Sequence, residues 1–187
     1  MLSHNQLRIG TRVEIDNLPW IIVTAQFVKP GKGQAFTKIR IKNLVDGRVI
    51  DRTYKSSETV IKADVVDVDM QFLYGDGNNW NFMDPATYEQ YTLSEAQVKE
   101  VIPWLKEQES YSVTLWAGKA ISVTPPPFLT LKITHCEPGI KGDTISGATK
   151  PATLETSAVV KVPLFVNEGE FVRVDTRTGE YVERAKG

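Results

Sequence analysis

The sequence has few of the residues on which disulfides and metal sites depend. Its 187 residues include one cysteine, Cys136, and two histidines, His4 and His135. A single cysteine excludes a disulfide within the chain. His135 and Cys136 are neighbours, and neighbouring residues of a strand point to opposite faces, so the pair makes a poor chelate. We therefore expect no metal and no cofactor, and we expect Cys136 to be a small core residue.

The sequence also lacks a hydrophobic run long enough to span a membrane. Its first ten residues, MLSHNQLRIG, do not have the basic-then-apolar order of a signal peptide. We expect a cytoplasmic protein with no membrane partner. No Ser/His/Asp order or nucleotide-binding fingerprint is present, so we expect no enzymatic activity and no catalytic residue. The acids Asp64, Asp67 and Asp69 are interpreted as a solvated strand edge.

What the sequence does have is an uneven distribution of charge. The net charge is −1, yet residues 1–63 carry eleven Lys or Arg against five Asp or Glu. Residues 64–110 carry two against ten, and residues 111–187 carry nine against eight. Such asymmetry indicates separate modules with different electrostatic roles.

The pattern of apolar and polar residues predicts many short β-strands and one helix. Ser94 and Gln97 form a capping box at the start of this helix, and Pro103 should end or kink it. Many short strands separated by turn residues are typical of small barrels or sandwiches. The predicted strands cover residues 11–15, 20–27, 37–44, 48–54, 65–74, 79–83, 112–116, 120–123, 129–134, 159–166 and 171–175.

Two features of the sequence indicate domain boundaries. The sign of the charge changes near residue 64, and Pro125, Pro126 and Pro127 form a rigid break that cannot join a β-ladder. We expect domains at residues 1–64, 65–127 and 128–187, each about the size at which a small β-barrel can still fold.

The stretch VKPGKGQAF, residues 28–36, lies between two predicted strands. Lys32 stands between Gly31 and Gly33, and glycine adopts positive φ without strain while Pro30 fixes its own φ. These residues predict a hairpin tip with one cationic side chain at its apex. An ordinary solvated turn is the alternative. A phosphate-binding loop is excluded, because the GxxxxGK[ST] pattern is absent and a strand follows where a helix is needed.

Basic residues gather around this tip. Residues 28–44 contain five basic side chains and no acid. Cations on one hairpin are typical of contact with a nucleic-acid backbone, although a solvated polar strand face would have the same alternation. The candidates for RNA-backbone contact beside Lys32 are Lys29, Lys38, Arg40 and Lys42.

Several motifs in fixed order carry a family resemblance. They are VKPGKGQAF at 28–36, KIRIKNLVDGRVIDRTYKSSETV at 38–60, DGNNWNFMD, VTLWAGKAISVTPPPF, LKITHCEPGIKGDT at 131–144, KPATLETSAVVKVPLFVNEGE at 150–170 and VDTRTGEYVER. With them the chain resembles the bacterial elongation factor P family over its whole length. One departure is Ser157, where the family usually has glycine. If that position needs positive φ, serine is strained there by ~1 kcal/mol.

The resemblance implies an all-β fold of three small β-barrel domains in an L-shaped, tRNA-like arrangement. The first domain would be an SH3-like (KOW-like) barrel, and the other two would be OB-folds, with one short helix in the second. The resemblance also implies a monomeric translation elongation factor that binds both ribosomal subunits between the peptidyl and exit sites. Such a factor positions peptidyl-tRNA carrying proline, stimulates peptide bond formation and relieves stalling at consecutive prolines.

The resemblance assigns roles to particular residues. The tip loop would reach the CCA end of the peptidyl-tRNA, and Lys32 would be β-lysylated, with hydroxylation as an option, by a lysyl-tRNA-synthetase-like ligase. Tyr181 and Arg184 would contact tRNA or the small subunit, although a plain C-terminal strand pair explains them nearly as well. The tip-loop residues are Pro30, Gly31, Lys32, Gly33 and Gln34. The residues that would contact mRNA at the exit-site codon are Gly142, Asp143, Thr144, Ser146 and Gly147.

Two other interpretations stay open at the level of sequence. An elongation-factor-P-like paralogue would share the fold, but its tip loop usually differs from KPGKGQAF. A generic OB-fold RNA-binding protein would present aromatic side chains as stacking platforms. The four tryptophans could serve that purpose, but each lies in an apolar pattern that favours the core. They are Trp20, Trp80, Trp104 and Trp116.

Overall fold

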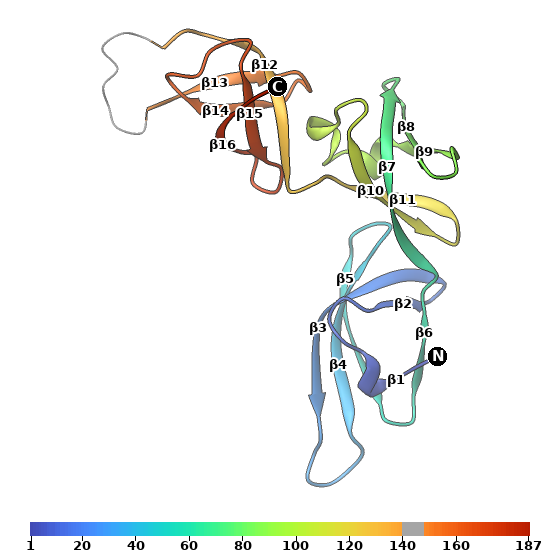
Figure 1. Ribbon diagram of the computed structural model, residues 1–187. Helices are drawn as coiled ribbons and strands as arrows, with labels where there is room; N and C mark the ends of the chain where they lie inside the picture. The colour runs from blue at the N-terminus through green and yellow to red at the C-terminus, as the bar shows by residue number, and fades with distance from the viewer. Residues whose placement is uncertain (140–147) are drawn as a thin grey trace. The chain divides into compact units, whose positions relative to one another are not determined.

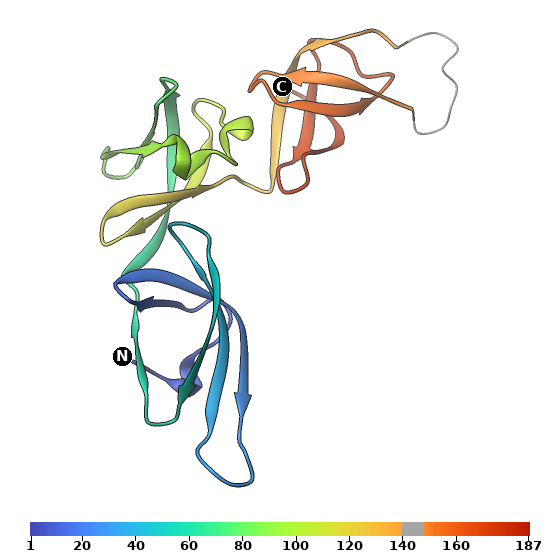
Figure 2. The ribbon, with the colours of Figure 1, turned by 180° about the vertical axis from the view of Figure 1, so that it is seen from behind.

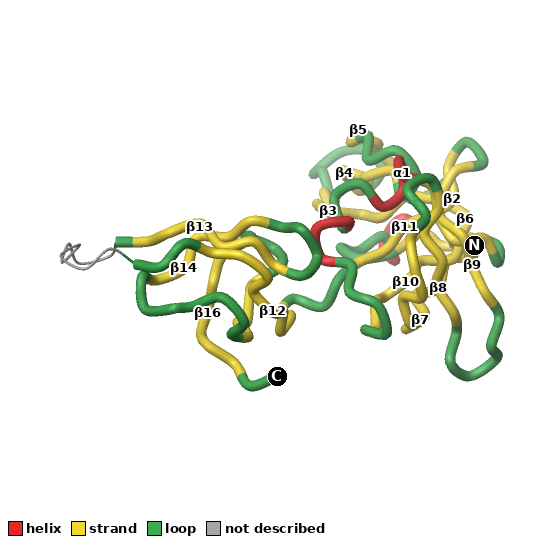
Figure 3. The backbone as a smooth tube through the Cα atoms, turned by 90° about the horizontal axis from the view of Figure 1, so that it is seen from above, coloured by secondary structure: helices red, strands yellow, loops and turns green. Residues whose placement is uncertain are grey.

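The computed structural model of the protein describes residues 1–139 and 148–187. Within these residues the chain forms three β-sheets (Figure 1). Very little of the backbone is helical, as the red segments of Figure 3 show. The mostly β fold expected from the alternating sequence is confirmed.

The first sheet has six strands in the order β1-β6-β2-β3-β4-β5. Its inward-facing residues form one apolar core around Trp20, which is 2% exposed. The other buried members are Leu7, Val13, Ile22, Ile39, Ile41 and Val60. The strands are β1 (Leu2–Ser3), β2 (Arg12–Ile15), β3 (Leu18–Val28), β4 (Phe36–Asn43), β5 (Val49–Lys55) and β6 (Thr59–Lys62).

The second sheet has five strands in the order β11-β10-β7-β8-β9. Aromatic rings fill its interior: the ring centroids of Phe72 and Phe82 lie 5.1 Å apart, and both rings meet Tyr111 edge-on. The strands are β7 (Val65–Gly75), β8 (Asn79–Met83), β9 (Gln90–Ser94), β10 (Ser110–Trp116) and β11 (Lys119–Thr124).

The strand edge predicted from the alternating acids stays a prediction. Strand β7 lies between β10 and β8, but its pairs with β8 run only from Gln71 to Gly75, beyond Asp67 and Asp69. Asp67 is exposed, as expected, but its carboxylate accepts hydrogen bonds from Arg12 at 2.6 Å and from Thr114 at 2.7 Å. Asp64 precedes the strand, and its carbonyl oxygen accepts a hydrogen bond from the Ala117 N–H.

The third sheet has five strands in the order β14-β13-β12-β15-β16. Its core is aliphatic, and Cys136 belongs to it at 8% exposure, so the predicted core position of the cysteine is confirmed. Ser157, in the turn between β13 and β14, has a φ of 70°. The strands are β12 (Phe128–Cys136), β13 (Thr149–Leu154), β14 (Val159–Pro163), β15 (Phe171–Asp175) and β16 (Glu180–Ala185).

The helix is shorter than the sequence predicts. Helix α1 (Glu95–Val98) starts with the expected capping box, in which the Ser94 N–H donates to Gln97 Oε1 at 2.9 Å. A separate 3₁₀ turn, η2 (Ile102–Trp104), has Pro103 in its first turn. Proline lacks the N–H that a continuous helix needs, so the two segments do not join.

The chain divides into two compact units. One comprises Met1–Val68 with Val113–Ser122, and the other comprises Asp69–Ser112 with Val123–Gly187. The division into domains at residues 64 and 127 stays a prediction.

Candidate nucleic-acid interface

The predicted tip loop lies at the end of the β3–β4 hairpin. The two strands are antiparallel, and their last pair is Val28 with Phe36. In both ribbon views (Figures 1 and 2) this hairpin projects beyond the β5–β6 turn of the same sheet. The hairpin predicted from the glycine-flanked motif is therefore confirmed.

The backbone of the loop leaves the lysine uncovered. Gly33 has a φ of 102°, a conformation that side-chain-bearing residues rarely adopt, whereas Gly31 does not need positive φ. A Cβ atom at Gly31 would meet nothing within 4 Å, and one at Gly33 would meet only Pro30 Cγ at 4.0 Å. Lys32 is exposed, and within residues 1–139 and 148–187 it has no hydrogen-bond or ion-pair partner. Its ammonium is thus available to a partner molecule.

Strand β4 carries the predicted stripe of basic residues. Its burial alternates, so Ile39 and Ile41 face the core while Lys38, Arg40 and Lys42 are exposed. This in-and-out arrangement confirms the alternation expected from the sequence.

One cation of the stripe has a partner that the sequence did not reveal. Arg40 is paired across the ladder with Asp51 of β5, and its Nε lies 2.9 Å from the carboxylate. The hydrogen bond from Arg40 lowers the pKa of Asp51 and raises the pKa of Arg40. Because both side chains are exposed, such a pair stabilises the fold little. Arg40 therefore contributes less free positive charge to the hairpin than Lys38 or Lys42.

The two predicted contact residues near the C-terminus lie on β16, which pairs with β15. Tyr181 is half-buried against the third core, and burial raises the pKa of its hydroxyl. Arg184 donates to Glu170 at 3.0 Å, and its guanidinium lies 5.4 Å from the centre of the Phe165 ring. The strand pair that the sequence left as an alternative is thus present.

The residues proposed for the exit-site codon lie outside the described residues. They are Gly142, Asp143, Thr144, Ser146 and Gly147.

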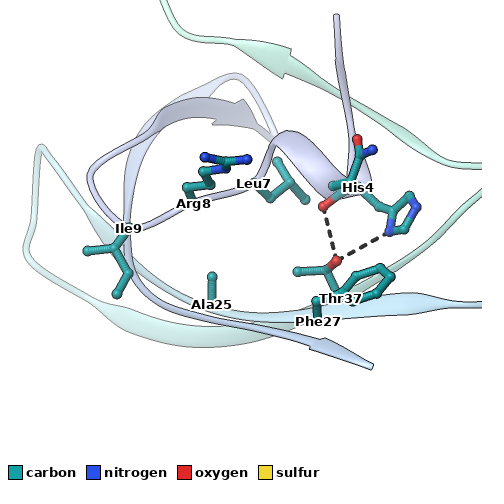
Figure 4. A pocket seen from close by; sticks show the side chains of 8 residues that line it. His4, Leu7, Arg8, Ile9, Ala25, Phe27 and Thr37 are labelled. Atoms are coloured by element: carbon teal, nitrogen blue, oxygen red, sulfur yellow. Dashed lines mark hydrogen bonds between the residues drawn. The ribbon is translucent and has the colours of Figure 1, made fainter. Parts of the chain in front are cut away.

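A cavity beside the hairpin was not predicted. It has a volume of about 540 Å³ and lies between the segment from His4 to Ile9 and strands β3 and β4 (Figure 4). The Phe27 side chain is 55% exposed, and its ring stacks on His4 with centroids 5.5 Å apart. Thr37 holds His4 in place: its hydroxyl donates to the His4 carbonyl oxygen at 3.0 Å and lies 3.3 Å from Nδ1.

A bulge explains why Phe27 faces this cavity. The register of β3 against β4 shifts between Ile22 and Thr24, so the residues that face inward change from the even to the odd numbers. Ala25 and Phe27 therefore continue the inner face beyond the core, opposite Ile39 and Thr37. Regular alternation from Trp20 would have turned Phe27 to the other face.

The tryptophans do not form exposed stacking platforms. Trp20 is 2% exposed and Trp80 is 8% exposed, while Trp104 and Trp116 are half-buried. Their predicted place in the core is confirmed for the first two.

Within residues 1–139 and 148–187, no cluster of three or more His, Cys, Asp or Glu could hold a metal ion. None of the helices in those residues has the length and apolar character needed to cross a membrane.

Comparison with known proteins gives matches along almost the entire chain. The model of the "Elongation factor P (EF-P) KOW-like domain" matches residues 3–60, and that of the "Elongation factor P (EF-P) OB domain" matches residues 65–123. The model "Elongation factor P, C-terminal" matches residues 129–184. Elongation factor P of Magnetococcus marinus is 66% identical over 187 residues, which is 100% of both chains.

Solved structures share the fold at lower identity. Translation initiation factor 5A from Methanococcus jannaschii is 23% identical, with a TM-score of 0.55 over 66% of this chain and 93% of that chain. A translation initiation factor eif-5a family protein from Naegleria fowleri is 17% identical, with a TM-score of 0.50 over 66% of this chain and 96% of that chain. These likenesses support the fold alone.

The KOW-like and OB domains, together with the projecting hairpin, define a translation factor rather than a classical enzyme. The full-length relative narrows this class: the chain belongs to the elongation factor P family. It is therefore a translation elongation factor that interacts with the ribosome.

Proposed function

We propose that this factor binds the ribosome between the peptidyl and exit sites, with Lys32 directed at the CCA end of a prolyl peptidyl-tRNA. It stimulates peptide bond formation there and relieves stalling at consecutive prolines. The observation that carries this proposal is the exposed Lys32 side chain at the end of a projecting hairpin. The family relationship supplies the ribosomal setting.

The chemistry of Lys32 suits positioning better than proton transfer. An exposed lysine is a cation at neutral pH and settles against RNA phosphates. Proline is a stiff and poor nucleophile, so holding the peptidyl-tRNA in a reactive geometry removes part of an entropic barrier. About 1.4 kcal/mol of such positioning corresponds to a tenfold change in rate. The ribosome itself performs the reaction.

We also propose that Lys32 is β-lysylated, with an optional hydroxylation, by a lysyl-tRNA-synthetase-like ligase. The exposed position of Lys32 supports this, and a Cβ atom added at Gly31 beside it would meet nothing within 4 Å. Pro30 and Gln34 would present the lysine to both the ligase and the tRNA. Mass spectrometry of the protein from its native host tests the proposal, and an unmodified Lys32 peptide contradicts it.

The surrounding contacts are proposed on the same grounds. Lys29, Lys38, Arg40 and Lys42 would contact the RNA backbone, and Arg184 with Tyr181 would contact tRNA or the small subunit. Each lysine that neutralises one phosphate contributes nearly one unit to the slope of log K against log salt. Replacing Lys42 with Gln should therefore lower the salt dependence of ribosome binding, and Arg40→Gln should lower it less because Asp51 already pairs with Arg40.

The segment at 142–147 would lie by the mRNA codon of the exit site, and the protein would act as a cytoplasmic monomer. The three β-sheets would correspond to domains at residues 1–64, 65–127 and 128–187.

A translation mixture depleted of the native factor tests the role of Lys32. We expect wild-type protein to restore synthesis of a reporter with consecutive prolines and Lys32→Ala to fail. Lys32→Arg keeps the charge but cannot take the same acyl group, so it should also fail if the extended amine matters. Lys119→Ala is the matched control, because Lys119 is also exposed and also follows a glycine at a hairpin turn.

The outcomes separate a functional effect from a folding effect. All variants should unfold at the same temperature as wild type, because Lys32 is exposed and has no hydrogen-bond or ion-pair partner within the described residues. Full rescue by Lys32→Ala would contradict the proposal. Equal loss of rescue in Lys119→Ala would show that any hairpin-turn lysine is needed, which also contradicts it.

A further inference from the structure

The cavity between the His4–Ile9 segment and the β3–β4 hairpin has the features of a nucleobase site. Its volume of about 540 Å³ lies within the range of small-molecule pockets. Its lining combines apolar side chains with a few polar ones, and Figure 4 shows Phe27, Ala25 and Ile9 around it. Exposed apolar side chains that lie together mark binding sites, and here Phe27 is 55% exposed and Ile9 is 70% exposed in the lining of one cavity.

The aromatic surface is held ready for stacking. The rings of His4 and Phe27 are stacked, with their centroids 5.5 Å apart and an angle of 27° between the ring planes. Two contacts from Thr37 to His4 fix that pair from strand β4. A rigid aromatic surface with an open side loses little conformational entropy when a flat ring stacks on it. Every base presents such a ring, and stacking on an aromatic side chain stabilises single-stranded nucleic acid.

The charge around the cavity favours RNA over a protein partner. The eight described residues that line it include the cation Arg8 but no acid. The whole segment from residue 1 to residue 63 has eleven Lys or Arg against five Asp or Glu. A positively charged surface that tracks a phosphate backbone, interrupted by an aromatic platform, is the general design of single-strand binding sites.

We propose that this cavity receives one unpaired base of single-stranded RNA, stacked on the His4–Phe27 pair, while Arg8 contacts the neighbouring phosphate. This proposal rests on the proposed function and deepens it, since it adds a contact to a base on the hairpin that carries Lys32. It does not depend on Lys32 itself or on its modification.

The full-length protein and a short oligonucleotide test this directly. The probes are a six-residue adenosine RNA and a six-residue RNA backbone that lacks bases, both titrated by fluorescence anisotropy at fixed low salt. We expect the adenosine RNA to bind at least fivefold more tightly than the backbone without bases, and Phe27→Ala to abolish this difference. Backbone amide signals of Ile9, Ala25 and Thr37 should shift on binding only with the adenosine RNA.

Three further variants make the result specific. Phe27→Trp should bind as tightly as wild type, whereas Phe27→Leu, which keeps an apolar surface without an aromatic ring, should bind like Phe27→Ala. Tyr88→Ala is the control, because Tyr88 is 74% exposed and lies outside the cavity. Phe27 is not part of the core, so these proteins should fold, which circular dichroism checks.

Two outcomes would overturn the proposal. Equal binding of the two probes would mean that only the phosphates are recognised. Wild-type binding by Phe27→Leu would mean that the cavity is a plain apolar surface, as a protein partner would need. Neither outcome affects the reporter test of Lys32, so the two proposals fail independently.

Discussion

Replacing Tyr111 with phenylalanine tests the packing of the second sheet. The Tyr111 side chain is 1% exposed, and its hydroxyl accepts a hydrogen bond from the Lys106 N–H at 2.8 Å and donates to the Trp104 carbonyl oxygen. Phenylalanine keeps the ring contacts with Phe72 and Phe82 but leaves both backbone groups without this partner.

The expected cost follows from these two bonds. A buried backbone group that loses its partner costs about 1–3 kcal/mol. Lys106 and Trp104 are both half-buried, so water replaces part of what is lost. We therefore expect Tyr111→Phe to lose about 2–3 kcal/mol of unfolding free energy in urea. Tyr91→Phe is the matched control: the Tyr91 hydroxyl donates to exposed Glu89, so its loss should stay within about 0.5 kcal/mol.

The pH dependence of this difference provides a second measurement. Burial raises the pKa of Tyr111 to about 12, against an opposing hydrogen bond from the Lys106 N–H. A raised pKa means that the stabilisation is complete below the ordinary tyrosine value of about 10 and is lost as the pH rises through the folded value. The stability gap between wild type and Tyr111→Phe should therefore narrow above pH 10. A gap below about 0.5 kcal/mol at pH 7, or one that widens above pH 10, would refute the reasoning.

Three more substitutions probe single residues, each measured by urea denaturation of the full chain. Ser157→Gly should stabilise the protein by about 1 kcal/mol, because glycine adopts the observed φ of 70° without strain, and an unchanged midpoint would contradict this. Lys150→Met should stabilise the protein by about 1–3 kcal/mol, because burying an ammonium without a partner is costly. Lys150 is 7% exposed, and its ammonium has no hydrogen-bond partner within residues 1–139 and 148–187. A less stable variant would show that the charge is compensated. Burial raises the pKa of Asp67, but the hydrogen bonds from Arg12 and Thr114 outweigh burial and lower that pKa. The stabilisation that these hydrogen bonds give is therefore present above the ordinary aspartate pKa and is lost as the pH falls through the folded value. Asp67→Asn should therefore cost about 0.5–1 kcal/mol at pH 7 and progressively less below about pH 4, and a cost that grows in acid would be inconsistent with the pair.

The alternation of apolar and polar residues in the sequence predicted those strands that have one buried face and one exposed face. Strands β8 and β15 have the predicted bounds, because inward and outward residues alternate along their whole length. Strand β6 was missed because Val60 is its only buried residue. Strand β13 was missed because Pro151 argues against a central strand. Its pairing with β12 begins at Ala152, so the missing N–H of Pro151 does not interrupt that ladder.

The candidate site was predictable where it depends on local chemistry. A lysine between two glycines predicts an uncovered apex, and Lys32 is exposed. The pairing of Arg40 with Asp51 was not predictable, because the acid comes from a neighbouring strand whose register the sequence does not reveal. The cavity at Phe27 depends on the bulge near Val23, and a bulge adds one residue without a sequence signal of its own here.

Beyond that bulge, the stem of the hairpin is less tolerant of length changes than its loop. Inserting one residue after Ala25 would exchange the two faces of the strand from Gln26 to Val28. Gln26 would then meet the apolar interior, while Phe27 would turn outward. An extra residue in the loop, by contrast, would change only the reach of the lysine. Variation in length among functional descendants of this chain should therefore concentrate beyond Val28 and spare the eleven residues of β3.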